Sequence, residues 1–267
     1  MICERLYELL ELPEEVKDKL LKNNYLRHYD FYNRYKDVFF DRACWDDAVK
    51  EIQRELSDDE EGMKILWVEL DFACRTYDEY RKTGIPGRIF IYTMKFCTRF
   101  VNQYHEIYGE YKFVWGWWFP RQISMQEFRI GSLEFEFIAD KDIIAVHIPS
   151  DADLSPESVN RSFSAFKEFR EVYYPEWMHK RIGCDSWMMS PVLKQLLAED
   201  SNILKFQNLF DTISTDYDSM AVLDWVFPGY SNVDDSLPEN TSLQRKMKKY
   251  LICGGKIGWS TAVMPHD

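Results

Sequence analysis

Two aspartates and a histidine lie close together in the stretch HIPSDAD, His147 to Asp153. Carboxylate and imidazole groups can exchange protons near neutral pH, and they can also bind divalent metal ions. The stretch ends an apolar run and precedes the start of a helix. Four interpretations therefore compete: a metal site, a phosphate-binding loop, an acid–base cluster, and a corner between a strand and a helix.

The corner interpretation explains the polar residues by helix capping. Ser155 precedes Pro156 and Glu157, an order that is typical of a helix N-terminus. Asp151 and Asp153 would lie just ahead of the positive end of this helix, which would stabilise each carboxylate by about 0.3–1 kcal/mol. Every polar side chain of the stretch then has a structural role.

The metal and phosphate interpretations have less support. Asp151-x-Asp153 resembles the start of a calcium-binding loop, but Pro156 takes the place of its glycine and Ser162 that of its bidentate glutamate. An Asp-x-Asp pair could still present a metal ion to a nucleotide-sugar. A phosphate-binding loop needs glycines, whereas this loop has none and carries two acids that would repel a pyrophosphate. We therefore expect neither a metal ion nor a phosphate held in the usual manner.

Acid–base chemistry is the remaining interpretation. His147, Asp151 and Asp153 could face one cleft at the strand ends together with Glu134 and Glu136 of the preceding strand. A carboxylate whose pKa is raised by burial or by a like charge can take a proton from an amine near pH 7. A buried histidine on an apolar strand can also be a hydrogen-bonded core residue, so both interpretations of His147 stay open.

Two further segments carry groups that could bind a ligand. In IGCDSWMM, alternation places Cys184 and Ser186 on one face of a strand and Asp185 on the other. The segment lacks the neighbours that activate a nucleophilic cysteine, which favours a buried structural thiol. Asn202, at a helix start, could bind a ligand or its own turn. The glycines of CGGKIGWS follow a helix and precede a strand, so they fit a helix C-cap better than a dinucleotide loop.

The composition excludes several classes of protein. The 267 residues allow one large domain or two small ones, and the net charge of −12 argues against nucleic acid and anionic membranes as partners. The six cysteines form no CxxC pair, which favours reduced thiols and a cytosolic protein. The N-terminus does not resemble a signal peptide, and the sequence has no apolar run of about 18 residues. The oligomeric state stays open.

Two domains are expected, with a boundary at residues 115 and 116. Residues 1–115 should form helices, including 12–24, 57–84 and a central buried helix over 88–109. The helical pattern of apolar residues ends at FVWGWWFPRQ, Phe113 to Gln122, where Gly116 and Pro120 interrupt an aromatic cluster. This cluster fits a packing plug between domains, or alternatively one wall of a ligand cleft.

Residues 116–267 should form an α+β domain with a mixed sheet. Leu133, Phe135 and Phe137 alternate with Glu134 and Glu136, which predicts a strand that is joined in a hairpin to a second strand over 143–149. Further elements are a helix over 155–174, a strand over 181–189, helical pieces over 190–210, a hairpin of 210–216 with 220–227, a helix over 240–255 and a strand over 256–264. Helices packed against a mixed sheet follow from this order.

The C-terminal half resembles a known family through GSLEFEF, IIAVHIPSDADLSPESV and CDSWMMSPVLKQLLAEDSNILKFQ. These segments are similar to bacterial acyltransferase-domain-containing proteins, which pair a helical N-terminal domain with a domain like the GCN5-related N-acetyltransferases (GNAT-like). The match runs from about Ile130 to Met264. It implies a GNAT-like fold and transfer of an acyl group from acyl-CoA, as co-substrate, to an amine of a small molecule or peptide. No metal is expected.

The resemblance also implies where the reaction occurs. The strand that ends at Pro149 would be central, the helix from Pro156 would meet the cofactor pyrophosphate, and the strand of Cys184 would be the splayed neighbour. The acyl group would lie between these strands, and the backbone near Ile148 or Cys184 would polarise the thioester carbonyl. The catalytic candidates are Glu134, His147, Asp151 and Asp153, and the substrate- or cofactor-binding candidates are Ile148, Ser150, Cys184, Ser186, Trp187 and Asn202.

Two alternatives to this enzyme remain at the level of sequence. SDADLS stands where the family has a basic residue or glutamine followed by glycines. The departure favours a non-enzymatic ligand-binding protein whose GNAT-like cleft has lost coenzyme A. A metal-assisted transferase that uses Asp151 and Asp153 is the other alternative. The acidic residues at the strand ends favour the acyltransferase.

Overall fold

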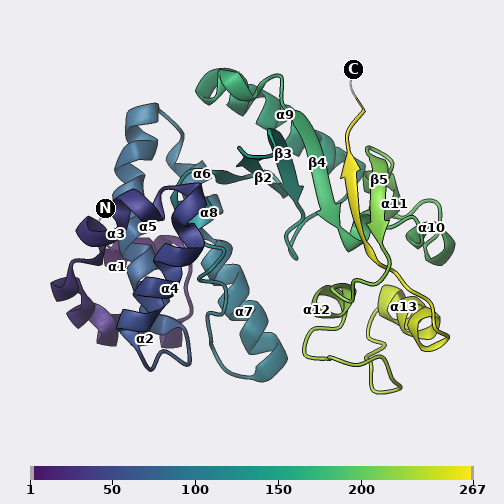
Figure 1. Cartoon of the computed structure of the whole chain (residues 1–267), viewed down its shortest axis with the longest axis horizontal. Coiled ribbons are helices and arrows are strands. Elements are labelled where there is room, and N and C mark those ends of the chain that lie inside the picture. The colour runs from purple at the N-terminus through teal and green to yellow at the C-terminus, as the bar shows by residue number, and fades with distance from the viewer. Residues whose placement is uncertain (1–2, 266–267) are drawn as a thin grey trace. The chain divides into compact units, whose positions relative to one another are not determined.

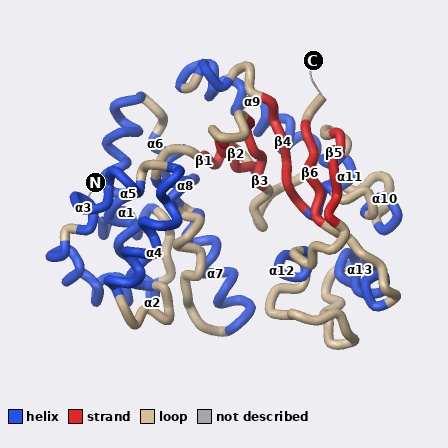
Figure 2. Tube along the Cα trace, in the orientation of Figure 1, coloured by secondary structure: helices blue, strands red, loops and turns tan. Residues whose placement is uncertain are grey.

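The structure is a computed structural model of the chain, and it describes residues 3–265. The chain divides into two compact units, Met1–Ile130 and Gly131–Asp267. Helices dominate the first unit, whereas the second combines a sheet with helices (Figures 1 and 2). Among the residues described, no helix has both the length and the apolar content that a membrane span requires.

The first unit is built around one long helix, α5, Met63–Thr83. Its buried side chains lie on most of its circumference, and it begins after Gly62 and ends at Gly84, both in the left-handed region. The other elements are α1 (Cys3–Leu9), α2 (Glu14–Lys22), η1 (Asn23–Tyr29), α3 (Phe31–Phe39), η2 (Arg42–Cys44), α4 (Trp45–Leu56), α6 (Gly87–Met94), α7 (Phe96–Tyr108), α8 (Pro120–Ile123) and the short strand β1 (Glu127–Ile130). The expectation of a helical N-terminal region is confirmed.

The single helix expected over 88–109 is wrong. The structure has two helices, α6 and α7, which meet at Lys95, where ψ is −3°. The apolar residues of this segment nearly encircle a straight helix, so one straight helix could not bury all of them against a single neighbour. A break at Lys95 lets Phe90 and Met94 of α6, and Cys97 and Val101 of α7, each reach the interior.

The aromatic segment around residues 113–122 belongs to the first unit. Phe113 and Phe119 are buried, and the Phe119 ring stacks on Phe96 with centroids 5.4 Å apart. Phe113 N–H also donates to the Glu61 carbonyl at 2.8 Å. These contacts tie the segment to the helices, and the compact units divide after Ile130, whereas the sequence places the domain boundary at residues 115 and 116.

The second unit contains a mixed sheet with strands in the order β2–β3–β4–β6–β5. The strands are β2 (Leu133–Ile138), β3 (Ile143–His147), β4 (Arg181–Ser186), β5 (Asp211–Asp216) and β6 (Trp259–Val263), and the helices are α9 (Pro156–Tyr173), η3 (Pro175–Trp177), η4 (Trp187–Met189), α10 (Leu193–Leu196), α11 (Asn202–Gln207), α12 (Val222–Val226) and α13 (Ser242–Ile252). β3 and β4 are parallel, and the other neighbouring pairs of this unit are antiparallel. The expected α+β class, the β2–β3 hairpin and the last strand are confirmed.

Helix α9 covers one face of this sheet. Phe135 of β2 stacks on Phe166 of α9 with ring centroids 3.9 Å apart, and Val146 lies opposite Phe135 in the register. Side chains at alternate positions of a strand lie on opposite faces. Glu134, Glu136 and their neighbours in the register therefore lie on the face away from α9.

The hairpin expected from residues 210–216 and 220–227 is wrong. The first segment is β5, which pairs with β6, and the second is the short helix α12. Val222, Leu223, Val226 and Phe227 are buried in one core cluster, and their spacing suits one face of a helix. Strand β6 supplies the hydrogen-bonding partner of β5, so residues 220–227 are free to bury their side chains as a helix.

Candidate active site

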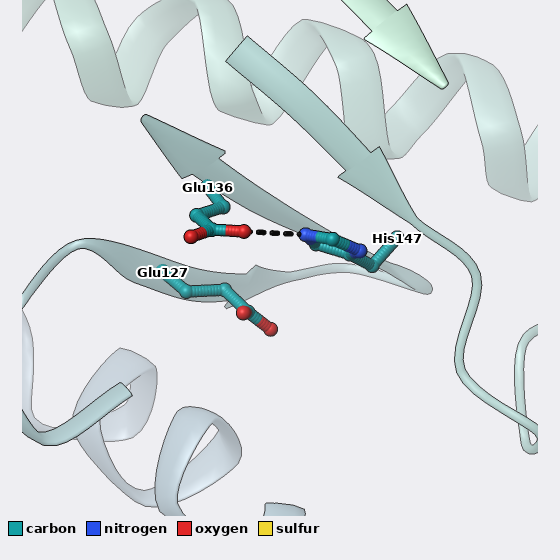
Figure 3. A group of neighbouring side chains, drawn as sticks. All are labelled: Glu127, Glu136 and His147. Atoms are coloured by element: carbon teal, nitrogen blue, oxygen red, sulfur yellow. Dashed lines mark hydrogen bonds and ion pairs between the residues drawn. The ribbon is translucent and has the colours of Figure 1, made fainter. Parts of the chain in front are cut away.

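A buried carboxylate and an imidazole form the centre of the candidate site. Oε2 of Glu136 lies 2.9 Å from Nε2 of His147 (Figure 3). The side chain of Glu136 is 2% exposed and that of His147 is 25% exposed. A carboxylate at this distance fixes the orientation of the ring and stabilises its protonated form. The pair can therefore accept and hold a proton while solvent or substrate still reaches the imidazole.

The β2–β3 hairpin creates this pair. Glu134 lies directly opposite His147 in the register, and Glu136 is the next residue of β2 on the same face. The structure thus brings together two of the catalytic candidates, Glu134 and His147. It adds Glu136, which alternation already places on their face but which is not among the four catalytic candidates named from the sequence.

Glu127, also drawn in Figure 3, belongs to the first unit and has its own donors there. Its carboxylate accepts hydrogen bonds from Nε2 of Gln122 at 2.8 Å and from Nε1 of Trp118 at 3.2 Å. Two donors of this kind stabilise a carboxylate that is fully buried. Nothing in the sequence pattern distinguishes Glu127, because its donors come from a turn and a short helix.

The parallel strands β3 and β4 stop pairing with each other before either strand ends. Their register runs from Ile143 opposite Arg181 to Ala145 opposite Gly183. Each strand continues on its outer side, β3 to the pair His147–Glu134 and β4 to the pair Ser186–Ser260. The imidazole thus lies on β3 just beyond the last pair of that strand with β4.

Asp153 acts as part of a helix cap. Its Oδ1 accepts the backbone N–H of Ser155 at 2.9 Å and its Oδ2 accepts the Ser155 hydroxyl at 3.0 Å, while Ser155 Oγ accepts the N–H of Ser158 at 3.4 Å. The hydrogen bond from the backbone N–H of Ser155 has the largest effect on the pKa of Asp153, and the one from the Ser155 hydroxyl the next largest. Both hold this pKa below its ordinary value. A carboxylate with a lowered pKa is a poor base, which supports the corner interpretation at Asp153. Asp151 is exposed in the same turn.

Replacing Asp153 with alanine is expected to lower the thermal midpoint by about 2–4 °C and to leave turnover unchanged. The pKa of Asp153 is lowered by folding, so its stabilising effect exists above its unfolded pKa and is lost as the pH falls. The midpoints of the two proteins should therefore converge in acid. Thermal unfolding by circular dichroism at several pH values, with the exposed Asp151→Ala as control, measures this. A large loss of turnover in Asp153→Ala alone would assign Asp153 to catalysis.

The candidates on β4 and beyond have varied surroundings. Cys184 is buried, burial raises the pKa of its thiol, and the register places it on the face covered by α9. Ser186 Oγ accepts the N–H of Met188 at 3.1 Å, and Trp187 is buried in the core. Asn202 is an exposed residue at the start of α11. Their roles in binding stay predictions, as do those of the partly exposed Ile148 and the exposed Ser150.

The turn after β4 is held by a buried amide. Nε2 of Gln207 donates to the carbonyls of Met188 at 3.1 Å and Ser190 at 2.7 Å, and the Ser190 hydroxyl donates to the Ile257 carbonyl at 2.5 Å. These hydrogen bonds connect α11, the turn and the segment before β6. The C-terminal end of β4 therefore has a fixed position beside the point where β3 and β4 separate.

Comparisons with known proteins agree with this architecture. A family model described as a GNAT-like C-terminal domain matches residues 127–264, and one described as an N-acyltransferase N-terminal domain matches residues 1–125. Among solved structures, the chain is similar to an acyltransferase in complex with decanoyl-CoA, with 19% identity and a TM-score of 0.76. It is also similar to an acyltransferase in complex with decanoyl-CoA and teicoplanin, with 20% identity and a TM-score of 0.78. Both alignments cover 98% of this chain and 87% of the other.

The two kinds of comparison carry different weight. A comparison with curated proteins found no match. The similarity to the solved structures shows a common fold. The GNAT-like model covers more than half of the sequence, including the whole β2–β3 hairpin and the separating strands. The chain therefore belongs to the family that this GNAT-like C-terminal domain defines, here preceded by an N-acyltransferase N-terminal domain.

Proposed function

We propose that the protein transfers an acyl group from acyl-CoA to an amine of a small molecule or peptide. The observation that carries this proposal is the Glu136–His147 pair, whose imidazole lies on β3 just beyond the last pair of that strand with β4. Family membership supports the same reaction class. The structures of similar fold, which hold decanoyl-CoA and in one case teicoplanin, are consistent with an acyl donor of this kind and with an amine on a small molecule or peptide.

The chain's own groups suffice for the proton transfers of this reaction. The amine nitrogen attacks the thioester carbonyl carbon, a C–N bond forms, and the C–S bond breaks. His147 takes the proton that the nitrogen loses, and this proton returns to the thiolate of coenzyme A, so that the products are an amide and a free thiol. Glu136 stabilises the imidazolium during the interval between the two transfers.

The fit to acyl-CoA differs between the two ends of the molecule. At the thioester end, β3 and β4 separate beyond Ala145 and Gly183, which gives an extended ligand access to backbone groups. At the pyrophosphate end, the turn before α9 has no glycine, and its first N–H groups are capped by Asp153 and Ser155. We therefore infer that the phosphates are held by other groups than the usual glycine loop.

A non-enzymatic binding protein is the alternative that the unusual turn suggests. The pair of Glu136 and His147 argues against it, because burial of a carboxylate costs free energy that a ligand-binding surface alone does not require. An enzyme needs such a pair for proton transfer. The acyltransferase is therefore the better proposal.

Binding of acyl-CoA by the whole protein tests the proposal. Calorimetry with acetyl-CoA and octanoyl-CoA should give micromolar dissociation constants, with no change when magnesium is added or removed. Incubation with an amine should then release free coenzyme A and form an amide that mass spectrometry detects. A folded protein that binds none of these donors would contradict the proposal and support the binding protein, and a strict need for magnesium would support the metal-assisted alternative.

A further inference from the structure

Asp185 lies on the same face of the sheet as His147. Asp185 is opposite Thr261 of β6, one position after Cys184, whose partner is Ala262. On the other side of β4, Ala145 pairs with Gly183, and His147 and Asp185 each follow two residues later. Since residues two apart on a strand share a face, Asp185 and His147 flank the point where β3 and β4 separate.

Packing at Gly183 confirms this assignment independently. A Cβ atom on Gly183 would lie 2.7 Å from Cδ1 of Ile143. Residue 183 and the side chain of Ile143 are therefore on the same face of the sheet. Ile143 also shares the face of the imidazole, because it lies four residues before His147 on the same strand. Asp185, two residues after Gly183, shares it too.

The charge and exposure of Asp185 set it apart on this face. Glu134 and Glu136 are buried beside His147, whereas Asp185 is exposed. Thr261, its partner on β6, is neutral, and the basic residue of β4, Arg181, begins the strand at its opposite end. Asp185 is an exposed carboxylate on the face of the imidazole, and its strand stays paired with β6 as far as Ser186. Such a carboxylate attracts a cation at a fixed position.

We propose that Asp185 is a specificity-determining residue that binds a second positive charge of the acceptor. This inference rests on the proposed function. The reacting amine lies at His147 on β3, and the second charge lies at Asp185 on the next strand. Neighbouring strands are about 4.8 Å apart where they pair, and β3 and β4 are farther apart beyond their last pair, Ala145–Gly183. The preferred acceptor class is therefore a diamine, or a peptide or small molecule with two amino groups separated by a few bonds, rather than a monoamine.

Putrescine and n-butylamine make a matched pair of acceptors, because both have four carbons and only putrescine carries the second charge. The wild-type protein should acylate putrescine with a kcat/KM, counted per amino group, about 1.4- to fivefold above that of butylamine, the range that one exposed charge pair supports. In Asp185→Asn this preference should disappear, with butylamine kinetics and acyl-CoA affinity unchanged. Asp211→Asn, an exposed aspartate on β5 two strands away, is the control and should keep the preference.

The outcomes separate this inference from the proposed function. If the wild-type protein acylates both amines at equal kcat/KM per amino group, or if Asp185→Asn keeps the preference for putrescine, the role of Asp185 is wrong while the acyltransferase stands. If the preference disappears equally in Asp211→Asn, the effect belongs to the general charge of the sheet, and the specific assignment fails. If neither amine is acylated and no acyl-CoA binds, the proposed function itself fails.

Discussion

Replacing His147 with glutamine is expected to lower kcat for acyl transfer about 10²–10⁴-fold, the usual contribution of a general base. Glutamine keeps the length and polarity of the side chain and can still bond to Glu136, but it cannot take a proton from the amine. The dissociation constant of acyl-CoA should not change, because His147 acts on the acceptor. Release of coenzyme A under saturating substrates measures kcat, and calorimetry measures donor binding.

Two further variants test whether the loss of activity depends on the Glu136–His147 pair rather than on the loss of any histidine. His179→Gln changes an exposed histidine of the same unit and should keep full activity. Glu136→Gln replaces the carboxylate 2.9 Å from the imidazole with an amide, which removes the charge that stabilises the imidazolium and should lower kcat about tenfold or more. Full activity of His147→Gln would contradict the proposed base, and an unchanged kcat in Glu136→Gln would contradict the role of Glu136.

The site could be predicted from the sequence only where local patterns fix it. Alternation in β2 and the short turn before Ile143 define the hairpin, and the hairpin brings Glu134 opposite His147. The hydrogen bond from His147 to Glu136 depends on side-chain conformations across the two strands, which a strand pattern does not specify. Asp153 shows the converse case, because the Ser155–Pro156 start of α9 already predicts its capping role.

The larger errors arise where tertiary packing decides. Val222, Leu223 and Val226 suit a strand or a helix. They form α12 because β6, rather than their own segment, pairs with β5. The segment around Lys95 is helical throughout, and the break depends on what α6 and α7 must each bury. The burial of Glu69 does have a local signal, since Glu69 is the first of the two acids in ILWVELDF and has apolar neighbours on both sides in a helix.

Replacing Glu69 with methionine is expected to stabilise the protein by about 1–3 kcal/mol at pH 8, the cost of a buried polar group without a partner. Glu69 lies on α5 and is fully buried, and neither of its carboxylate oxygens has a hydrogen-bond partner among the described residues. Burial, and to a lesser extent the charge of Asp59, raises its pKa well above the ordinary value of 4.5. Methionine fills a similar volume with no polar group to desolvate.

The pH dependence of this gain distinguishes burial of the carboxyl group from a packing effect. Glu69 stays protonated in the folded protein while the unfolded chain ionises above about pH 4.5, so wild-type stability falls as the pH rises toward the folded pKa. The advantage of Glu69→Met, measured by urea unfolding, should therefore be smaller at pH 5 than at pH 8, where the pH-dependent part is added to the cost of burying the neutral group. Glu79→Gln, an exposed change on the same helix, should show no such growth. An advantage that is constant with pH would mean improved packing, and a loss of stability at both pH values would mean that the Glu69 carboxyl group has a stabilising partner.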